Sequence, residues 1–139
     1  MIRAVLDTNV VVSALLFDGP ASHLVDAWSS KRFRFLLSKE ILDEYIRVLS
    51  YPKFHLTEDE IKRILAEVIF PFAIPLKVRP ILPVIKEDPS DDMFLALAQS
   101  GRSAFLVSGD RHLLGLGQFG RTKIVSIPVF LQHLDLEKR

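Results

Sequence analysis

Short apolar runs alternate with amphipathic segments along the chain, and this alternation predicts strands that are separated by helices. Short runs at residues 2–6, 33–37, 104–107 and 123–126 are suited to the strands of a parallel sheet. A further strand, interrupted by prolines, is expected near residues 74–78. Strands that alternate with helices are typical of a parallel sheet covered on both faces, so the pattern predicts an α/β fold.

Helices are predicted between the strands from apolar spacing, caps and breakers, at residues 8–17, 21–30, 39–49, 58–70, 89–100, 111–114 and 129–134. Ser38 is a good N-cap residue, and Thr57 with Glu60 has the spacing of a capping box. Asp88 precedes a proline, the usual order of a cap and a first helical residue. No linker or repeat separates these elements, so we expect one domain over residues 1–139.

The composition narrows the classes of function. Hydrophobic residues make up 49% and charged residues 25% of the 139, which is ordinary for a globular protein. There is no cysteine, which excludes a disulfide scaffold, a thiolate metal site and a cysteine nucleophile. The formal net charge of +1 does not indicate a strongly electropositive nucleic-acid binder. No apolar run approaches the ~18–20 residues of a membrane helix, so we expect a soluble cytoplasmic protein that does not associate with a membrane.

Acidic residues fall at the ends of predicted strands and at the starts of predicted helices. Asp7 closes the first strand, and Asp110 follows the fourth strand by three residues. Asp91 and Asp92 lie at the start of the helix that precedes that fourth strand. In a parallel α/β sheet, ligands bind beyond the carboxyl ends of the strands, near the switch in strand order. Glu44 borders the apolar face of its own helix, from which we expect it to point into the same cleft.

Carboxylates that share a cleft repel one another and raise one another's pKa values unless a cation offsets their charge. No lysine or arginine adjoins Asp7 or the Asp91-Asp92 pair in sequence. Mg²⁺ and Mn²⁺ prefer oxygen ligands, and such an ion activates water and stabilises charge on a phosphate during its transfer. The acidic residues therefore point to metal-assisted hydrolysis of phosphodiester bonds.

Each acidic residue also has an ordinary structural explanation. Asp7 and Asp110 could cap the helices that follow them, and Asp91 and Asp92 could interact with a helix dipole. Glu44 could be a solvated residue on the surface of its helix. These explanations account for each position alone but not for the convergence of all of them on one edge of one sheet.

Four motifs, in this order, resemble the PIN domain family: residues 6–10 with 13–15, residues 40–44, residues 88–92 and residues 107–110. The resemblance covers essentially the whole chain and is specific because the four motifs occur together. More narrowly, the chain resembles the VapC-like ribonucleases, which are toxins of toxin–antitoxin systems.

This resemblance implies a three-layer α/β/α fold with a parallel sheet in the order 3-2-1-4-5. It also implies a site for Mg²⁺ or Mn²⁺ and endonuclease activity on single-stranded RNA. Asp7, Glu44, Asp91 and Asp110 match the four acids of the family and are the expected catalytic and metal-binding residues. Asp92 is a further, less certain metal ligand.

The resemblance extends to supporting residues and to partners. Thr8, Asn9 and Ser108 match the polar positions that support the acids, although many relatives carry threonine where this chain has Ser108. A cognate antitoxin protein and a homodimer are the implied partners. Two alternatives stay open: an inactive PIN fold that serves as a partner-binding module, and an RNA-processing nuclease that is not a toxin.

Other acidic α/β families fit less well. A haloacid-dehalogenase-type phosphatase needs a second aspartate two residues after the first, where this chain has Asn9. A phosphoreceiver domain needs an acidic pair at the first strand and an acceptor aspartate after a middle strand, which the sequence does not supply. Arg111, Lys39 and Arg121 are candidates for contact with an RNA backbone, and His112 is expected to have a surface or packing role.

Overall fold

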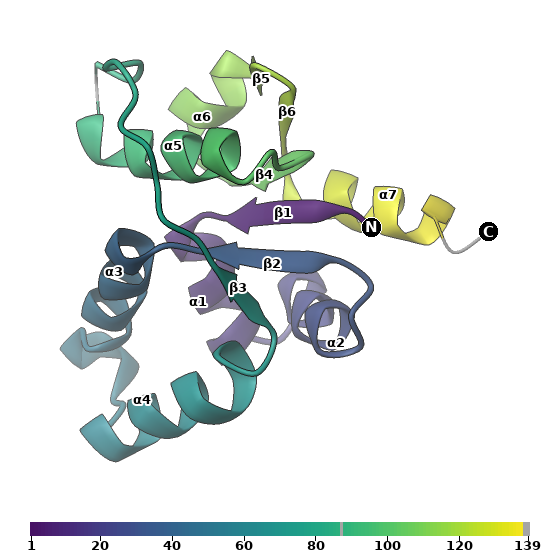
Figure 1. Cartoon of the computed structure of the whole chain (residues 1–139). Helices are drawn as coiled ribbons and strands as arrows, with labels where there is room; N and C mark the ends of the chain where they lie inside the picture. Colours follow the sequence, from purple (N-terminus) through teal and green to yellow (C-terminus); the bar gives the residue numbers. More distant parts are fainter. Residues whose placement is uncertain (87, 138–139) are drawn as a thin grey trace.

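The computed structural model describes residues 1–86 and 88–137. Within them, one six-stranded sheet has the order β3-β2-β1-β4-β6-β5 (Figure 1). The strands are β1 (Arg3–Leu6), β2 (Arg34–Leu37), β3 (Ala73–Pro75), β4 (Phe105–Val107), β5 (Gln118–Phe119) and β6 (Thr122–Val125). All neighbouring strands pair in parallel except β5, which runs antiparallel to β6.

Helices connect the strands, as the alternating pattern predicts. They are α1 (Thr8–Leu16), α2 (His23–Ser29), α3 (Lys39–Leu49), α4 (Glu58–Ile64), α5 (Asp92–Ser100), α6 (Arg111–Leu116) and α7 (Ile127–Glu137). The α4 helix continues as a π-helical segment, Leu65–Ile69, and a 3-10 turn, Pro89–Asp91, precedes α5. The predicted N-cap at Ser38 and the capping box of Thr57 and Glu60 are confirmed.

The predicted α/β fold is confirmed, and the predicted strand order needs one addition. The five parallel strands have the expected arrangement, with β6 in the position predicted for the fifth strand. The short strand β5 was not expected, because two residues cannot show a periodic pattern. It forms a hairpin with β6 in which Gly120 adopts a positive φ of 57°. The third strand is also shorter than predicted and ends at Pro75, which has no N–H to donate.

Aromatic side chains show which helices cover one face of the sheet. Phe35 on β2 stacks between Trp28 of α2 and Tyr45 of α3. Phe105 on β4 contacts Phe130 of α7. Phe35 and Phe105 are both aligned with Ala4 of β1 in the neighbouring strand pairs, so their side chains lie on the same face of the sheet. The α2, α3 and α7 helices therefore cover this face.

The α5 helix covers the opposite face. It packs against β1 and β4, and Gly101 at its C-terminus lies against Leu36 of β2. The chain leaves β1 toward β2 and β3 but then crosses back along α5 to β4 on the other side of β1 (Figure 1). The order of strands thus reverses between β1 and β4, which is the place where α/β sheets form ligand sites.

Within the described residues, no single helix has both the length and the apolar composition needed to cross a membrane. The α1 helix and the segment Pro20–Ser29 reach the required length and apolar composition only when taken together, and the chain bends by 93° between them.

The close approach of α5 to the sheet depends on Gly101. A Cβ atom there would lie 2.6 Å from Leu36 Cδ1 and 3.2 Å from the Leu97 carbonyl oxygen. We expect Gly101→Ala to lower the free energy of unfolding by about 1–3 kcal/mol, measured by urea denaturation, because the added methyl overpacks a filled core. The control is Gly115→Ala in α6, where a Cβ meets nothing within 4 Å. That variant should be stable or slightly stabilised, and equal losses in both variants would contradict the packing argument.

Candidate active site

The site lies at the carboxyl ends of β1 and β4, at the reversal of strand order. Asp7 follows β1 directly, and its backbone N–H donates to the Val107 carbonyl oxygen at 3.0 Å. The ladder of the two strands therefore extends to Asp7 and fixes it beside the turn that leaves β4. That turn carries Ser108 and Asp110.

Ser108 links the two acids that follow these strands. Its hydroxyl donates to Asp7 Oδ2 at 2.6 Å and accepts the backbone N–H of Asp110 at 2.9 Å. The Ser108 side chain is fully buried, so both hydrogen bonds are shielded from water. The hydroxyl predicted to support the acids thus orients Asp7 and fixes the turn that carries Asp110.

The Asp7 carboxylate lies in the site instead of capping α1. No hydrogen bond from its side chain caps that helix. Burial raises the pKa of Asp7, and the charges of Asp110 and Glu44 raise it further, whereas hydrogen bonds with Ser108 and the Thr8 backbone lower it. Asp110 and Glu44 therefore lie near enough to Asp7 for their charges to raise its pKa, as convergence on one site requires.

Asp91 has the most perturbed carboxyl group of the cluster. Burial, followed by the charges of Asp110, Asp88 and Asp7, raises its pKa from 3.8 to about 7. Its Oδ2 atom is buried and has no hydrogen-bond partner within the described part of the chain. A buried carboxylate oxygen without a partner is costly unless another group compensates it.

Asp110 caps α6 and also faces Asp91. Its Oδ1 atom accepts the backbone N–H groups of His112 and Leu113, at 2.8 and 3.1 Å. Potential ligand atoms of Asp91, Asp110 and His112 lie within 4.8 Å of one another. The predicted capping role and the predicted site role of Asp110 are therefore compatible. The sequence predicts a surface or packing role for His112, whereas the structure places its imidazole next to the two acids; its position two residues after an N-cap acid is the signal in the sequence.

Glu44 lies near the site but is paired with a cation. It is partly buried on α3, and its charge contributes to the raised pKa of Asp7. Its Oε2 atom accepts a hydrogen bond from Arg47, one turn later on the same helix. The structure thus brings Glu44 to the margin of the cluster, with Arg47 neutralising part of its charge.

Asp92 is not brought into the cluster. Its two carboxylate oxygens accept the backbone N–H groups of Val84 and Ile85, at 3.1 and 2.9 Å. These bonds fasten the segment before α5 to the start of that helix. Of the two adjacent aspartates, Asp91 faces the other acids and Asp92 has a structural role.

The remaining supporting residues differ in their environment. Thr8 is buried, and its hydroxyl has no hydrogen-bond partner within the described residues, whereas Asn9 is exposed. Tyr45, fully buried on α3, donates its hydroxyl to the carbonyl of Leu6, directly before Asp7. Burial and the charge of Asp7 hold the pKa of Tyr45 well above its usual value. This phenol thus anchors the end of β1 next to Asp7.

Comparison with known proteins bears directly on this cluster. A family model of the PIN domain matches residues 3–112, which include every acid described above. The chain belongs to the PIN domain family. No curated protein matches the chain. PIN domains are generally nucleases and typically use divalent metal ions.

The residues of this PIN domain fit a divalent cation. Asp91, Asp110 and His112 offer ligand atoms that lie close together, and the buried Asp91 Oδ2 has no partner within the described residues. The raised pKa values of Asp91 and Asp7 show that the uncompensated cluster resists full ionisation. Two carboxylates and an imidazole are an acceptable donor set for Mn²⁺, and the carboxylates suit Mg²⁺.

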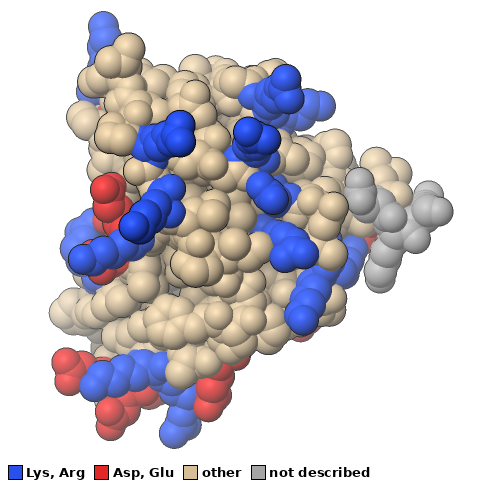
Figure 2. Space-filling model, in the orientation of Figure 1, with Lys and Arg blue, Asp and Glu red and all other residues tan. Residues whose placement is uncertain are grey.

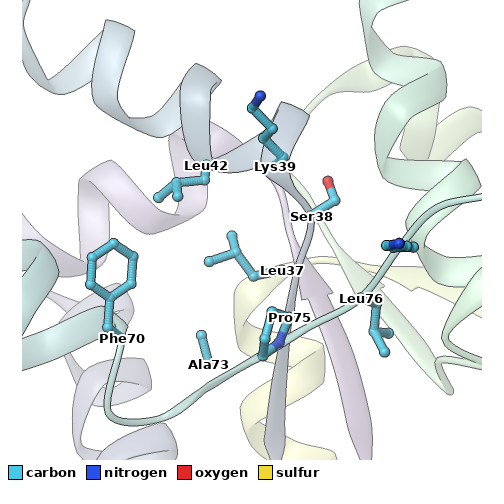
Figure 3. A pocket seen from close by; sticks show the side chains of 9 residues that line it. Leu37, Ser38, Lys39, Leu42, Phe70, Ala73, Pro75 and Leu76 are labelled. Carbon is cyan, nitrogen blue, oxygen red and sulfur yellow. The ribbon is translucent and has the colours of Figure 1, made fainter.

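An apolar pocket of about 500 Å³ lies apart from this cluster, at the β3 edge of the sheet (Figure 3). The side chains of Leu37, Leu42 and Phe70 contribute to its lining, and no acidic residue is among them. Its lining therefore does not fit the chemistry of the PIN site.

The stability of this PIN domain without metal should depend on the ionisation of Asp91. Between pH 3.8 and about 7, the folded protein retains a proton on Asp91 that the unfolded chain releases. The unfolding free energy contributed by this group therefore falls as the pH rises through that interval. We expect the melting temperature in EDTA to fall less steeply with pH for Asp91→Asn than for the wild type.

Metal should reverse this trend, because it binds the ionised carboxylate. Mn²⁺ should raise the melting temperature of the wild type more at pH 8 than at pH 5, and should do so much less in Asp91→Asn. Asp43→Asn, which changes an exposed acid on α3, is the control and should behave like the wild type. An Asp91→Asn protein with the pH and Mn²⁺ responses of the wild type would contradict the assignment.

Proposed function

We propose that this PIN domain is a Mg²⁺- or Mn²⁺-dependent endoribonuclease that hydrolyses phosphodiester bonds in single-stranded RNA. The observation that carries the proposal is the convergence of Asp7, Asp91 and Asp110 at the β1–β4 reversal. Their mutual effect on pKa values supports a site that needs a cation to become fully charged. An anionic phosphodiester would otherwise be repelled by such a cluster.

Asp7, Asp91 and Asp110 would hold the cation, with His112 as a further nitrogen ligand next to Asp110. A bound cation of this kind supplies charge stabilisation for the phosphate and a water of lowered pKa. Ser108 holds Asp7 in one orientation through its 2.6 Å hydrogen bond. Because two α6 N–H groups occupy Asp110 Oδ1, the Asp110 Oδ2 atom stays available to the site.

Glu44 has a separate role in this proposal. Its carboxylate lies at the edge of the cluster and is held by Arg47. We assign it to the positioning of the attacking water, with Arg47 fixing its orientation. The arrangement leaves Asp92 outside the chemistry, since both of its oxygens hold backbone amides.

The direct test is cleavage of a panel of single-stranded RNAs with Mg²⁺, Mn²⁺ or EDTA. Asp7→Asn keeps the size of the side chain and removes the charge that binds metal. We expect this change to lower the cleavage rate about 100-fold or more, and EDTA to abolish wild-type cleavage. Asp43→Asn, at an exposed position of α3, serves as the matched control and should cleave like the wild type.

Equal cleavage by the wild type and Asp7→Asn, or cleavage that persists in EDTA, would contradict the proposed site. No cleavage of any RNA with either metal would instead favour the inactive PIN fold that binds a partner. Circular dichroism and melting curves of each variant separate loss of chemistry from loss of folding.

We further propose that the nuclease is the toxin of a toxin–antitoxin pair in the cytoplasm. The resemblance of the four motifs to VapC-like toxins supports this narrower role. Induced expression of the wild type alone should slow growth, whereas Asp7→Asn should not, and a neighbouring gene should encode a small antitoxin. Harmless expression of an active enzyme from a solitary gene would instead favour an RNA-processing nuclease.

A further inference from the structure

Basic side chains gather on the face of the molecule that carries α5. Figure 2 shows Lys and Arg spread across the middle and upper parts of this face, where little Asp or Glu is visible, whereas at its left and lower margins Asp and Glu lie among further Lys and Arg. The net charge of the whole chain is only +1, so the positive charge of the middle and upper parts of this face reflects an uneven distribution of charged residues over the surface.

The chain segment of residues 76–86 crosses over α5 and is fastened to it at two points (Figure 1). Near its start, the Arg79 N–H donates to Ser100 Oγ in the last turn of α5, at 2.9 Å. Near its end, Val84 and Ile85 donate to Asp92 in the first turn. The basic residues at the start of the segment are thus held beside the C-terminal end of α5.

Two adjoining grooves lie at this end of α5. The first, of about 710 Å³, is lined in part by Lys77, Arg79 and Arg102. The second, of about 590 Å³, is lined in part by Arg102 and Arg121. Gln99 and Arg102 line both grooves, so the two form one surface, which we call the basic groove.

The cations of the basic groove are available to a ligand. Lys77, Arg79, Arg102 and Arg121 are all exposed. The ion pairs found within residues 1–86 and 88–137 involve other cations. Guanidinium groups bind phosphate oxygens through two parallel hydrogen bonds, and the Gln99 amide adds a neutral donor. The groove therefore presents several spaced donors for the phosphates of an extended polyanion.

The basic groove and the acidic cluster lie at opposite ends of α5. Asp91 directly precedes this helix, and Arg102 follows its last residue by two positions. The nine residues of α5 span about 14 Å. A shallow depression lined by Ser90 and Met93, near the acidic end, shares Val78 and Pro80 with the basic groove. A continuous surface thus leads from the acidic end of the helix to the basic end.

We propose that the basic groove is a second contact site for single-stranded RNA, remote from the bond that is cut. It binds the phosphates a few nucleotides away from the phosphodiester in the acidic cluster, and α5 sets the spacing between the two sites. This inference rests on the proposed ribonuclease function. The cluster repels RNA when metal is absent, so the groove supplies the attraction that the cluster cannot.

The test compares RNA binding by the wild type and by a variant that carries Arg79→Gln and Arg102→Asn. Asparagine is chosen at position 102 because Arg102 has a positive φ of 51°, which asparagine tolerates. The matched control carries Lys62→Gln and Arg63→Asn, two exposed cations on α4. The control site is distant from α5, since the π-helical continuation of α4 packs on α2 through the Trp28–Val68 hydrogen bond, on the other face of the sheet.

Binding of a labelled RNA long enough to span both sites is measured by fluorescence anisotropy in EDTA over a range of salt concentrations. We expect the groove variant to bind about tenfold more weakly, with the slope of log K against log salt reduced by about 1.4. The α4 control should bind like the wild type. Cleavage assays with Mn²⁺ should show a raised KM and an unchanged kcat for the long RNA, and no change for a dinucleotide.

Each outcome bears on the proposal. An active enzyme whose groove variant binds and cleaves like the α4 control would overturn the groove while leaving the proposed function intact. Equal weakening in both variants would mean a diffuse charge effect and would also overturn it. A protein that cleaves no RNA but loses RNA binding in the groove variant would support the groove and locate the failure in the acidic cluster.

Discussion

The repulsion among buried carboxylates is the constraint on which this site depends. Asp7 and Asp91 are each buried, and each has a pKa raised in part by the charge of Asp110. A fold that only needed stability would not place these groups together, because burial and like charges both oppose ionisation. The cluster persists because strands and helix ends fix its members from different directions. A divalent cation would relieve this cost, and PIN nucleases typically use such ions.

The sheet topology produces this convergence from residues that are far apart in sequence. Reversal of the strand order puts the ends of β1 and β4 side by side, and α5 begins at the same edge. Ser108 then links Asp7 to the turn of Asp110, and Tyr45 donates a hydrogen bond to the Leu6 carbonyl at the end of β1. The C-terminal end of α5 lies at the basic groove. The same helix therefore sets the distance between the acidic cluster, where cleavage is proposed, and the basic groove, where a second contact with RNA is proposed.

Much of this arrangement was predictable from sequence because it follows from local rules. The capping box at Thr57, the N-cap at Ser38 and the parallel strands each have a signal within a few residues. The meeting of Asp7 with Asp110 follows from the rule for strand ends in α/β sheets. The sequence does not resolve which of Asp91 and Asp92 faces the other acids, because this depends on tertiary contacts. In the structure, backbone amides of the segment of residues 76–86 bind both Asp92 carboxylate oxygens, which leaves Asp91 to face the cluster.

The converging acids are expected to form one site for a divalent cation. Anomalous diffraction from crystals grown with Mn²⁺ tests it without reference to activity. We expect an anomalous peak within bonding distance of carboxylate oxygens of Asp91 and Asp110, with Asp7 beside it. Well-ordered crystals at a pH above 7 that show no peak there, even at millimolar Mn²⁺, would mean that these acids do not form a metal site.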